Sequence, residues 1–241
     1  MIRTLLLPLI SLPCLAASEW QPPSEIRHAV LVHGIWENEH RAFRSLRAEL
    51  EARGIHCVVP SLKPATAIHG IRPLATQLDA AVRLSLPKDE RFIVIAHSMG
   101  GLVSRAWLQD LGGIRNCDAL ITIASPHHGT RMAYAHPGQG AAEMRPGSAF
   151  LAELQATEDH LEKLPILSYR TPWDGVIVPH ESSVWPRATN VEIACFLHAR
   201  MTAHPALHAD LFDRLKLPPA PALAKRAEAR RIISRPRAFP R

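Results

Sequence analysis

The chain has 241 residues, of which 47% are hydrophobic and 21% charged, and these values predict a single globular domain with a sizeable core. The formal net charge of +6 lies entirely within residues 224–241, which hold seven Lys and Arg residues and one glutamate. Because residues 1–223 are then formally neutral, the globular part has no basic character, and we expect no nucleic-acid partner.

The two ends differ in composition from the rest of the chain. Residues 1–18 combine an early positive charge, an apolar stretch from Leu5 to Leu15 and small residues after it, which is the layout of a cleavable signal peptide. The protein would then be exported, periplasmic or secreted. Pro8 and Pro13 interrupt the stretch, and the alternative is an ordinary apolar N-terminus in a cytoplasmic protein. Residues 218–241 are rich in Pro, Ala and Arg and predict a disordered tail, which leaves 19–217 as the domain.

Short apolar runs of strand composition alternate with helical patterns along the domain. Between the runs, residues 40–54 and 71–86 repeat apolar residues at helical spacing, and Gly54 provides a C-terminal stop. This alternation predicts the α/β class, with a mostly parallel sheet covered by helices on both faces. The strand-like runs are 28–34, 56–60, 91–98, 119–126, 165–171 and 190–196.

One segment, residues 129–163, breaks the alternation. It contains Gly-rich turns and one helical piece that begins near Phe150. Connections of this length at the carboxyl ends of strands are commonly functional, so we expect a short cap or lid.

The stretch RFIVIAHSMGGLVSRAW, residues 91–107, passes from a buried strand to a helix without a loop. Ser98 lies at the apex of the turn, and Gly100 and Gly101 make so sharp a turn feasible. A serine between strand and helix is a nucleophile elbow, because the turn exposes the hydroxyl and directs the helix N-terminus toward an anion formed there. The usual G-x-S-x-G pattern is here A-x-S-x-G.

Three motifs in this order, VLVHGIWEN (30–38), AHSMGGLVSR (96–105) and ASPHHGT (124–130), resemble those of the α/β-hydrolase family, in particular its small bacterial triacylglycerol lipases and esterases. The resemblance covers roughly residues 28–215. It implies the α/β-hydrolase fold, and it implies that the backbone N–H groups of Ile35 and Met99 form the oxyanion hole. A tetrahedral oxyanion needs donors already aimed at it, each worth about 3 kcal/mol.

A serine hydroxyl also needs a base and an orienting carboxylate, which in this fold follow the serine in the order acid, then histidine. Among the later acidic residues, Asp174 lies in a Pro-Trp-Asp-Gly turn just beyond a strand-like run, and this placement also matches the acid of the family. Glu181 is the alternative acid.

The choice of base is between histidines that follow Asp174. His198 comes directly after the run 190–196 and so lies at a strand end, from which it can reach an elbow serine; we therefore favour it over His204. His208 lies inside a helical pattern, and His180 precedes the last strand. Family members often have glycine where this chain has Leu197, a departure that alters the loop before the base.

Together these residues predict a serine hydrolase that cleaves carboxylic esters through an acyl-enzyme intermediate, with no cofactor. The same residues would serve a thioesterase or an acyltransferase, and an inactive lipid- or partner-binding module is the non-enzymatic alternative.

Fourteen histidines raise the question of a metal, but no H-E-x-x-H or Cys-x-x-Cys pattern is present, and we expect no metal site. The expected partner is a small-molecule ester or lipid, with transient contact with a membrane or lipid surface; the oligomeric state stays open. Trp36, Trp173 and Trp185 each lie beside the end of a strand-like run and are candidates for an acyl pocket or for the core.

Overall fold

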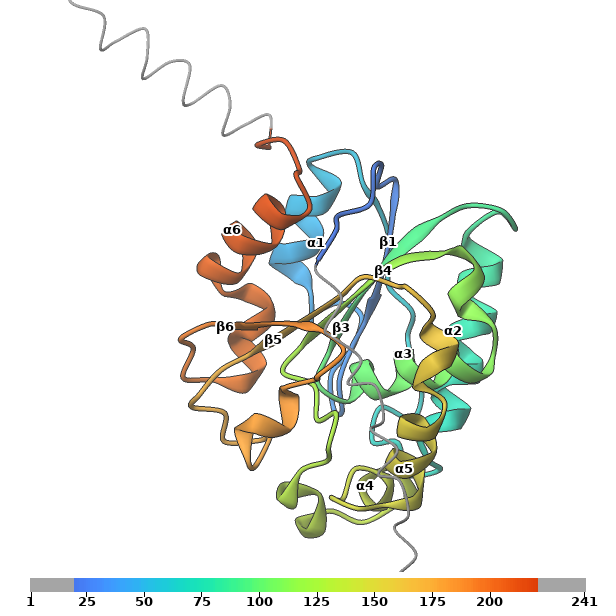
Figure 1. Ribbon diagram of the computed structural model, residues 1–241, viewed down its shortest axis with the longest axis vertical. Helices are drawn as coiled ribbons and strands as arrows, with labels where there is room; N and C mark the ends of the chain where they lie inside the picture. Colours follow the sequence, from blue (N-terminus) through green and yellow to red (C-terminus); the bar gives the residue numbers. More distant parts are fainter. Residues whose placement is uncertain (1–19, 221–241) are drawn as a thin grey trace, which may run out of the picture.

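A computed structural model describes residues 20–220 of the chain (Figure 1). The expected signal segment and nearly all of the expected tail lie outside the described residues. Six parallel strands form one sheet in the order β2-β1-β3-β4-β5-β6, and this confirms the predicted fold class. The strands are β1 (His28–Val32), β2 (His56–Val58), β3 (Phe92–His97), β4 (Cys117–Ile123), β5 (Ile166–Arg170) and β6 (Thr189–Glu192).

Helices cover both faces of the sheet (Figure 1). Alternate residues of the strands point to opposite faces, so each face has a core of its own. Val30 and Val94 pack with α2, α3 and α5 on one face, whereas Leu31 and Ile95 pack with α1 and α6 on the other. The α-helices are α1 (Arg44–Glu51), α2 (Ile71–Ser85), α3 (Met99–Asp110), α4 (Gln139–Glu143), α5 (Ala149–Ala156) and α6 (Pro205–Arg214).

Five short 3-10 helices lie in the connections of the described part. They are η1 (Gly113–Asn116), η2 (Arg131–Ala135), η3 (Glu158–Leu161), η4 (His180–Ser183) and η5 (His198–Ala203).

The predicted insertion at 129–163 contains α4, α5 and two of these 3-10 helices, and it joins the core on the α3 face. Leu154 is fully buried there, and the carboxylate of Glu143 accepts a hydrogen bond from the backbone N–H of Ile71, at the start of α2, at 2.6 Å. Ser148 begins α5 because its hydroxyl accepts from the N–H of Leu151. That this segment acts as a cap or lid stays a prediction.

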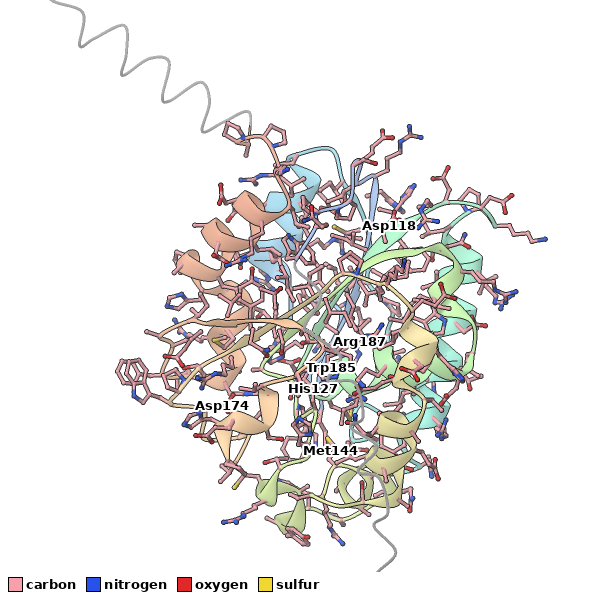
Figure 2. The ribbon with its side chains drawn as sticks, in the orientation of Figure 1. Asp118, His127, Met144, Asp174, Trp185 and Arg187 are labelled. Carbon is pink, nitrogen blue, oxygen red and sulfur yellow. The ribbon has the colours of Figure 1, made fainter. Side chains whose placement is uncertain are left out.

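The carboxyl ends of the strands define one end of the molecule. Figure 2 shows Asp174, His127 and Met144 toward the end where α4 and α5 lie, whereas Asp118, at the start of β4, lies at the opposite end. Every sequence-predicted site residue follows β1, β3, β5 or β6, so all of them belong to the carboxyl end of the sheet. Ligands of open parallel sheets bind at this end.

Candidate active site

Ser98 occupies a strained turn between β3 and α3. Its φ is +55° and its ψ is −128°, a conformation that costs an L-residue free energy and that folds keep mainly at functional positions. A hydrogen bond to the neighbouring strand fixes the turn: the backbone N–H of Ser98 donates to the carbonyl of Ile123 on β4 at 2.9 Å. Gly100 must lack a side chain, since a Cβ there would overlap backbone atoms of Val32 and His33. The predicted elbow is therefore present in geometry as well as in sequence.

The loop after β1 runs directly against Ser98. A Cβ placed on Gly34 would lie 2.8 Å from the Cβ of Ser98, so only glycine permits this approach. The loop is fixed by the buried His33, whose Nδ1 donates to the carbonyl of Gly34 at 2.9 Å and whose Nε2 accepts from the N–H of Leu62 at 3.1 Å. These partners assign the tautomer of the imidazole.

The two N–H groups expected to bind an oxyanion lie on either side of this approach. Ile35 follows Gly34 and Met99 follows Ser98, at the first position of α3. Within residues 20–220, neither N–H donates to an acceptor. The N–H of Met99 lies at the N-terminus of α3, where the positive end of the helix dipole favours a bound anion.

Asp174 and His198 form a buried pair at the ends of β5 and β6. The Nδ1 of His198 lies 2.8 Å from Oδ2 and 3.0 Å from Oδ1 of Asp174. The carboxylate also accepts the backbone N–H groups of Val176 and Ile177, each at 2.9 Å. Burial alone would raise the pKa of Asp174, but the hydrogen bond and charge of His198 and these two N–H groups hold the pKa below its ordinary value. The carboxylate is therefore ionised and fixes the orientation of the imidazole.

The other ring nitrogen of His198 is unoccupied. Its Nε2 is buried and has no hydrogen-bond partner among the described residues, the Ser98 hydroxyl included. The ring lies beside the elbow, because the centroids of His97 and His198 are 4.8 Å apart. Burial lowers the pKa of His198 below its ordinary value, as does the neighbouring His97, while Asp174 opposes the change. A neutral imidazole with a free Nε2 is what a general base needs.

The alternative residues take other places. Glu181 is largely exposed and lies 3.3 Å from the imidazole of its neighbour His180. His204 precedes α6, and His208 pairs with Glu49 at 2.9 Å. Among the described histidines, only His198 is hydrogen-bonded to Asp174.

A second histidine–carboxylate pair lies next to the first, and no sequence pattern indicated it. Glu37 accepts hydrogen bonds from the N–H of Gly34 at 2.6 Å and from the Nδ1 of His97 at 2.9 Å. The Nε2 of His97 lies 3.2 Å from the backbone carbonyl oxygen of His198. Each residue stands inside a motif quoted above, but no local pattern reveals that the two meet.

The three tryptophans have different environments. Trp185 is fully buried: it lies against His127, and its Nε1 donates to Glu158 at 2.8 Å, so it belongs to the core (Figure 2). Trp36 and Trp173 are half exposed, and Trp173 stacks on Phe196 with ring centroids 4.4 Å apart. This stacked pair joins the loop that carries Asp174 to the loop that carries His198.

No group of three His, Cys, Asp or Glu side chains within residues 20–220 is arranged to hold a metal ion. In the same range no helix has the length and apolarity needed to cross a bilayer.

Comparison with known families agrees with the fold and with these motifs. The family model for palmitoyl protein thioesterases matches residues 29–159, which include the loop after β1, the elbow and β4. The chain belongs to this family. The family match and the fold confirm the expected resemblance to α/β-hydrolase lipases and esterases. No curated protein sequence matches the chain significantly.

Solved structures similar to this family member include a Bacillus licheniformis lipase, BlEst2 in mature form, with 16% identity and a TM-score of 0.63 over 85% of this chain and 98% of that one. Aspergillus fumigatus lipase B is 14% identical, with a TM-score of 0.67 over 83% of this chain and 57% of its own. A thermophilic esterase from Thermogutta terrifontis is 15% identical, with a TM-score of 0.51 over 81% of this chain and 91% of its own. At these identities the likeness establishes the fold. The family match supports hydrolysis of ester bonds in general.

Proposed function

We propose that the protein is a serine hydrolase that cleaves carboxylic esters or thioesters through an acyl-enzyme intermediate. The observation that carries this proposal is the base: His198 has its Nδ1 on Asp174 and its Nε2 buried and unoccupied, beside the strained turn of Ser98. A buried polar atom without a partner is rare in folded proteins and calls for an explanation. A substrate-dependent partner, the serine hydroxyl as it attacks, is such an explanation.

The chemistry follows the acyl-transfer scheme. The Oγ of Ser98 attacks the carbonyl carbon while Nε2 of His198 takes its proton, and Asp174 stabilises the imidazolium that forms. The N–H groups of Ile35 and Met99 donate to the oxyanion of the tetrahedral intermediate. The imidazolium then protonates the leaving alcohol or thiol, and a water molecule repeats the sequence at the acyl carbonyl to release the acid.

The family match favours one particular second candidate, a thioesterase that removes long acyl chains. The matching family is described by palmitoyl protein thioesterases, and its model spans the elbow. The residues proposed here can act on both oxygen and sulfur esters, because the serine attack and the oxyanion precede departure of the alcohol or the thiol. Substrate comparison therefore decides between the two.

The test is a series of p-nitrophenyl esters and acyl thioesters, from short to long chains, with four proteins. Wild type is expected to turn over part of the series, and Ser98→Ala and His198→Ala are each expected to lower kcat/KM by about 10⁴- to 10⁶-fold. His204→Ala, the matched histidine control, is expected to stay within about threefold of wild type. If a fluorophosphonate probe fails to label folded wild type, or labels Ser98→Ala equally, the proposal is wrong.

We further propose export of the protein and transient contact with a lipid surface, on the composition of residues 1–18 and on the exposed Trp173 and Phe196. The mass of the protein recovered from the periplasm or medium tests export, since cleavage would remove about 18 residues. Sedimentation with phospholipid vesicles tests the contact, and a Phe196→Ser variant that sediments as well as wild type would contradict this role for the pair.

A further inference from the structure

The pair formed by Glu37 and His97 connects three segments of the site. Glu37 comes from the loop after β1, His97 from the end of β3, and the carbonyl oxygen that His97 contacts belongs to His198, after β6. Through the N–H of Gly34, Glu37 also holds the backbone that precedes Ile35. One buried pair thus touches the oxyanion loop, the elbow and the loop of the base.

The hydrogen-bond partners of His97 indicate its protonation state. Nδ1 faces a carboxylate oxygen and Nε2 faces a backbone carbonyl oxygen, and both of these groups only accept hydrogen bonds. A neutral imidazole has one N–H and would leave one of the two contacts without a proton. With Glu37 ionised, both bonds form only when His97 is an imidazolium, and its side chain is 1% exposed, so bulk water does not reach either nitrogen.

The acid of this pair is suited to stabilise that cation. Burial alone would raise the pKa of Glu37, but the charge and hydrogen bond of His97 and the N–H of Gly34 keep it below its ordinary value. Glu37 is therefore a carboxylate beside His97, and the two charges compensate each other in the buried site.

We propose, on the basis of the proposed function, that Glu37 and His97 are positioning residues: an ion pair that fixes the loop of His198 and keeps its Nε2 free of a proton so that it can act as a base. The centroids of the His97 and His198 rings are 4.8 Å apart, and the Nδ1 of His97 contacts Glu37 at 2.9 Å. The charge of His97 lowers the pKa of His198 more than the charge of Glu37 raises it.

Three ionisable groups act on His198, and their signs give the expected pH dependence. Asp174 and Glu37 favour the protonated imidazole, whereas His97 and burial disfavour it, and the pKa of His198 is lowered as a result. Removing the cation while Glu37 remains should raise that pKa, so that His198 loses its role as base at a higher pH. Removing Glu37 should raise the pKa of His198 by less, because two effects oppose each other. His97 loses the carboxylate that stabilises its charge, but the negative charge that favours a proton on His198 disappears as well.

The experiment measures pH profiles of kcat/KM for wild type, His97→Gln, Glu37→Gln and His28→Gln. The last is a matched control, because His28 contacts Glu90 at 3.2 Å but lies at the opposite end of β1. We expect the acidic limb to move to higher pH in His97→Gln and by less in Glu37→Gln, and to stay in place in His28→Gln. We also expect the plateau of His97→Gln to fall less than about a hundredfold. A fall in the plateau without movement of the limb would show a merely structural role and overturn the proposal.

A second measurement does not depend on turnover. In ¹⁵N-histidine-labelled Ser98→Ala at pH 8, both ring nitrogens of His97 should give imidazolium signals, assigned by their loss in Ser98→Ala/His97→Gln. A neutral His97 in that spectrum would overturn the proposal, whatever the pH profile of His97→Gln shows. If instead wild type hydrolyses no ester or thioester while His97 is an imidazolium, the proposed function has failed and the ion pair itself stands.

Discussion

His97 and His198 both use Nδ1 to contact a carboxylate, at 2.9 and 2.8 Å, and both are buried against each other. They differ at Nε2. In His97 this atom contacts a backbone carbonyl, whereas in His198 it is unoccupied among the described residues. A carboxylate partner therefore does not distinguish the proposed base from its neighbour; the free second nitrogen does.

His208 supports the same distinction from outside the site. Its Nδ1 contacts Glu49 at 2.9 Å and its Nε2 contacts the carbonyl oxygen of Thr202 at 2.8 Å, so both nitrogens are occupied, as in His97. The three histidine–carboxylate pairs thus separate into two whose histidine has both ring nitrogens occupied and one whose histidine has a free Nε2.

The largest expected effect comes from Asp174→Asn. The amide nitrogen can donate to Nδ1 of His198, which would place the remaining proton on Nε2 and remove its capacity to accept one. We expect kcat/KM to fall by about 10⁴-fold at pH 8, with little change in circular dichroism. The matched change at the saturated pair, Glu49→Gln, should leave kcat/KM within about threefold. Loss of less than tenfold in Asp174→Asn would mean that another carboxylate orients the base.

A smaller loss is expected from Gly34→Ala, which disturbs the elbow without altering either pair chemically. The new methyl would lie 2.8 Å from Cβ of Ser98 and 2.9 Å from a carboxylate oxygen of Glu37, so the loop must shift by a fraction of an ångström. Displacements of that order cost about 10²-fold in rate. Gly175→Ala is the control, because a Cβ there meets no atom within 4 Å. Equal kcat/KM values for the two variants would refute the close approach.

The smallest expected effect is on the free energy of unfolding, through the buried His127. Burial, with the charges of Arg105 and His128, lowers the pKa of His127 well below its ordinary value. The unfolded chain therefore binds a proton below about pH 6.5 that the folded chain does not, and the free energy of unfolding should fall with decreasing pH by up to about 1.4 kcal/mol per unit. Above that pH this contribution is fully present.

Urea unfolding of wild type and His127→Gln at pH 7, 6 and 5 measures this slope. The variant should have a shallower slope that is not zero, because the pKa of His198 is lowered as well. His40→Gln, at an exposed histidine, should keep the slope of wild type. An unchanged slope in His127→Gln would show that His127 takes up a proton in the folded state.

The sequence was most informative where the signal is local. Each of the six strand-like runs overlaps one strand, and Ser98 stands at the predicted turn, because apolar runs and the His-Ser-Met-Gly-Gly step act over a few residues. Boundaries were less accurate: the run 28–34 ends as a strand at Val32, since His33 turns its ring onto its own loop. The helix expected within 40–54 covers Arg44–Glu51.

Partners distant in sequence were harder to predict. The position of Asp174 and His198 after strands suggested both residues, but the preference over His204 depends on how the loop after β6 folds back, which no spacing encodes. The contact of Glu37 with His97 joins residues 60 positions apart, and the sequence contains nothing that distinguishes this glutamate from a solvated one. Whether Ile35 and Met99 bind an oxyanion stays a prediction.

The order of the strands also has a consequence during synthesis of the chain. Ser98 lies after the third strand, but the histidine proposed to activate it lies after the sixth, about a hundred residues later in translation. A ribosome-bound chain can therefore form the elbow well before it has any group to take the proton of the hydroxyl. Under the proposed mechanism, hydrolytic capacity arises only when β6 joins the edge of the sheet, so unfinished chains would carry an inert serine.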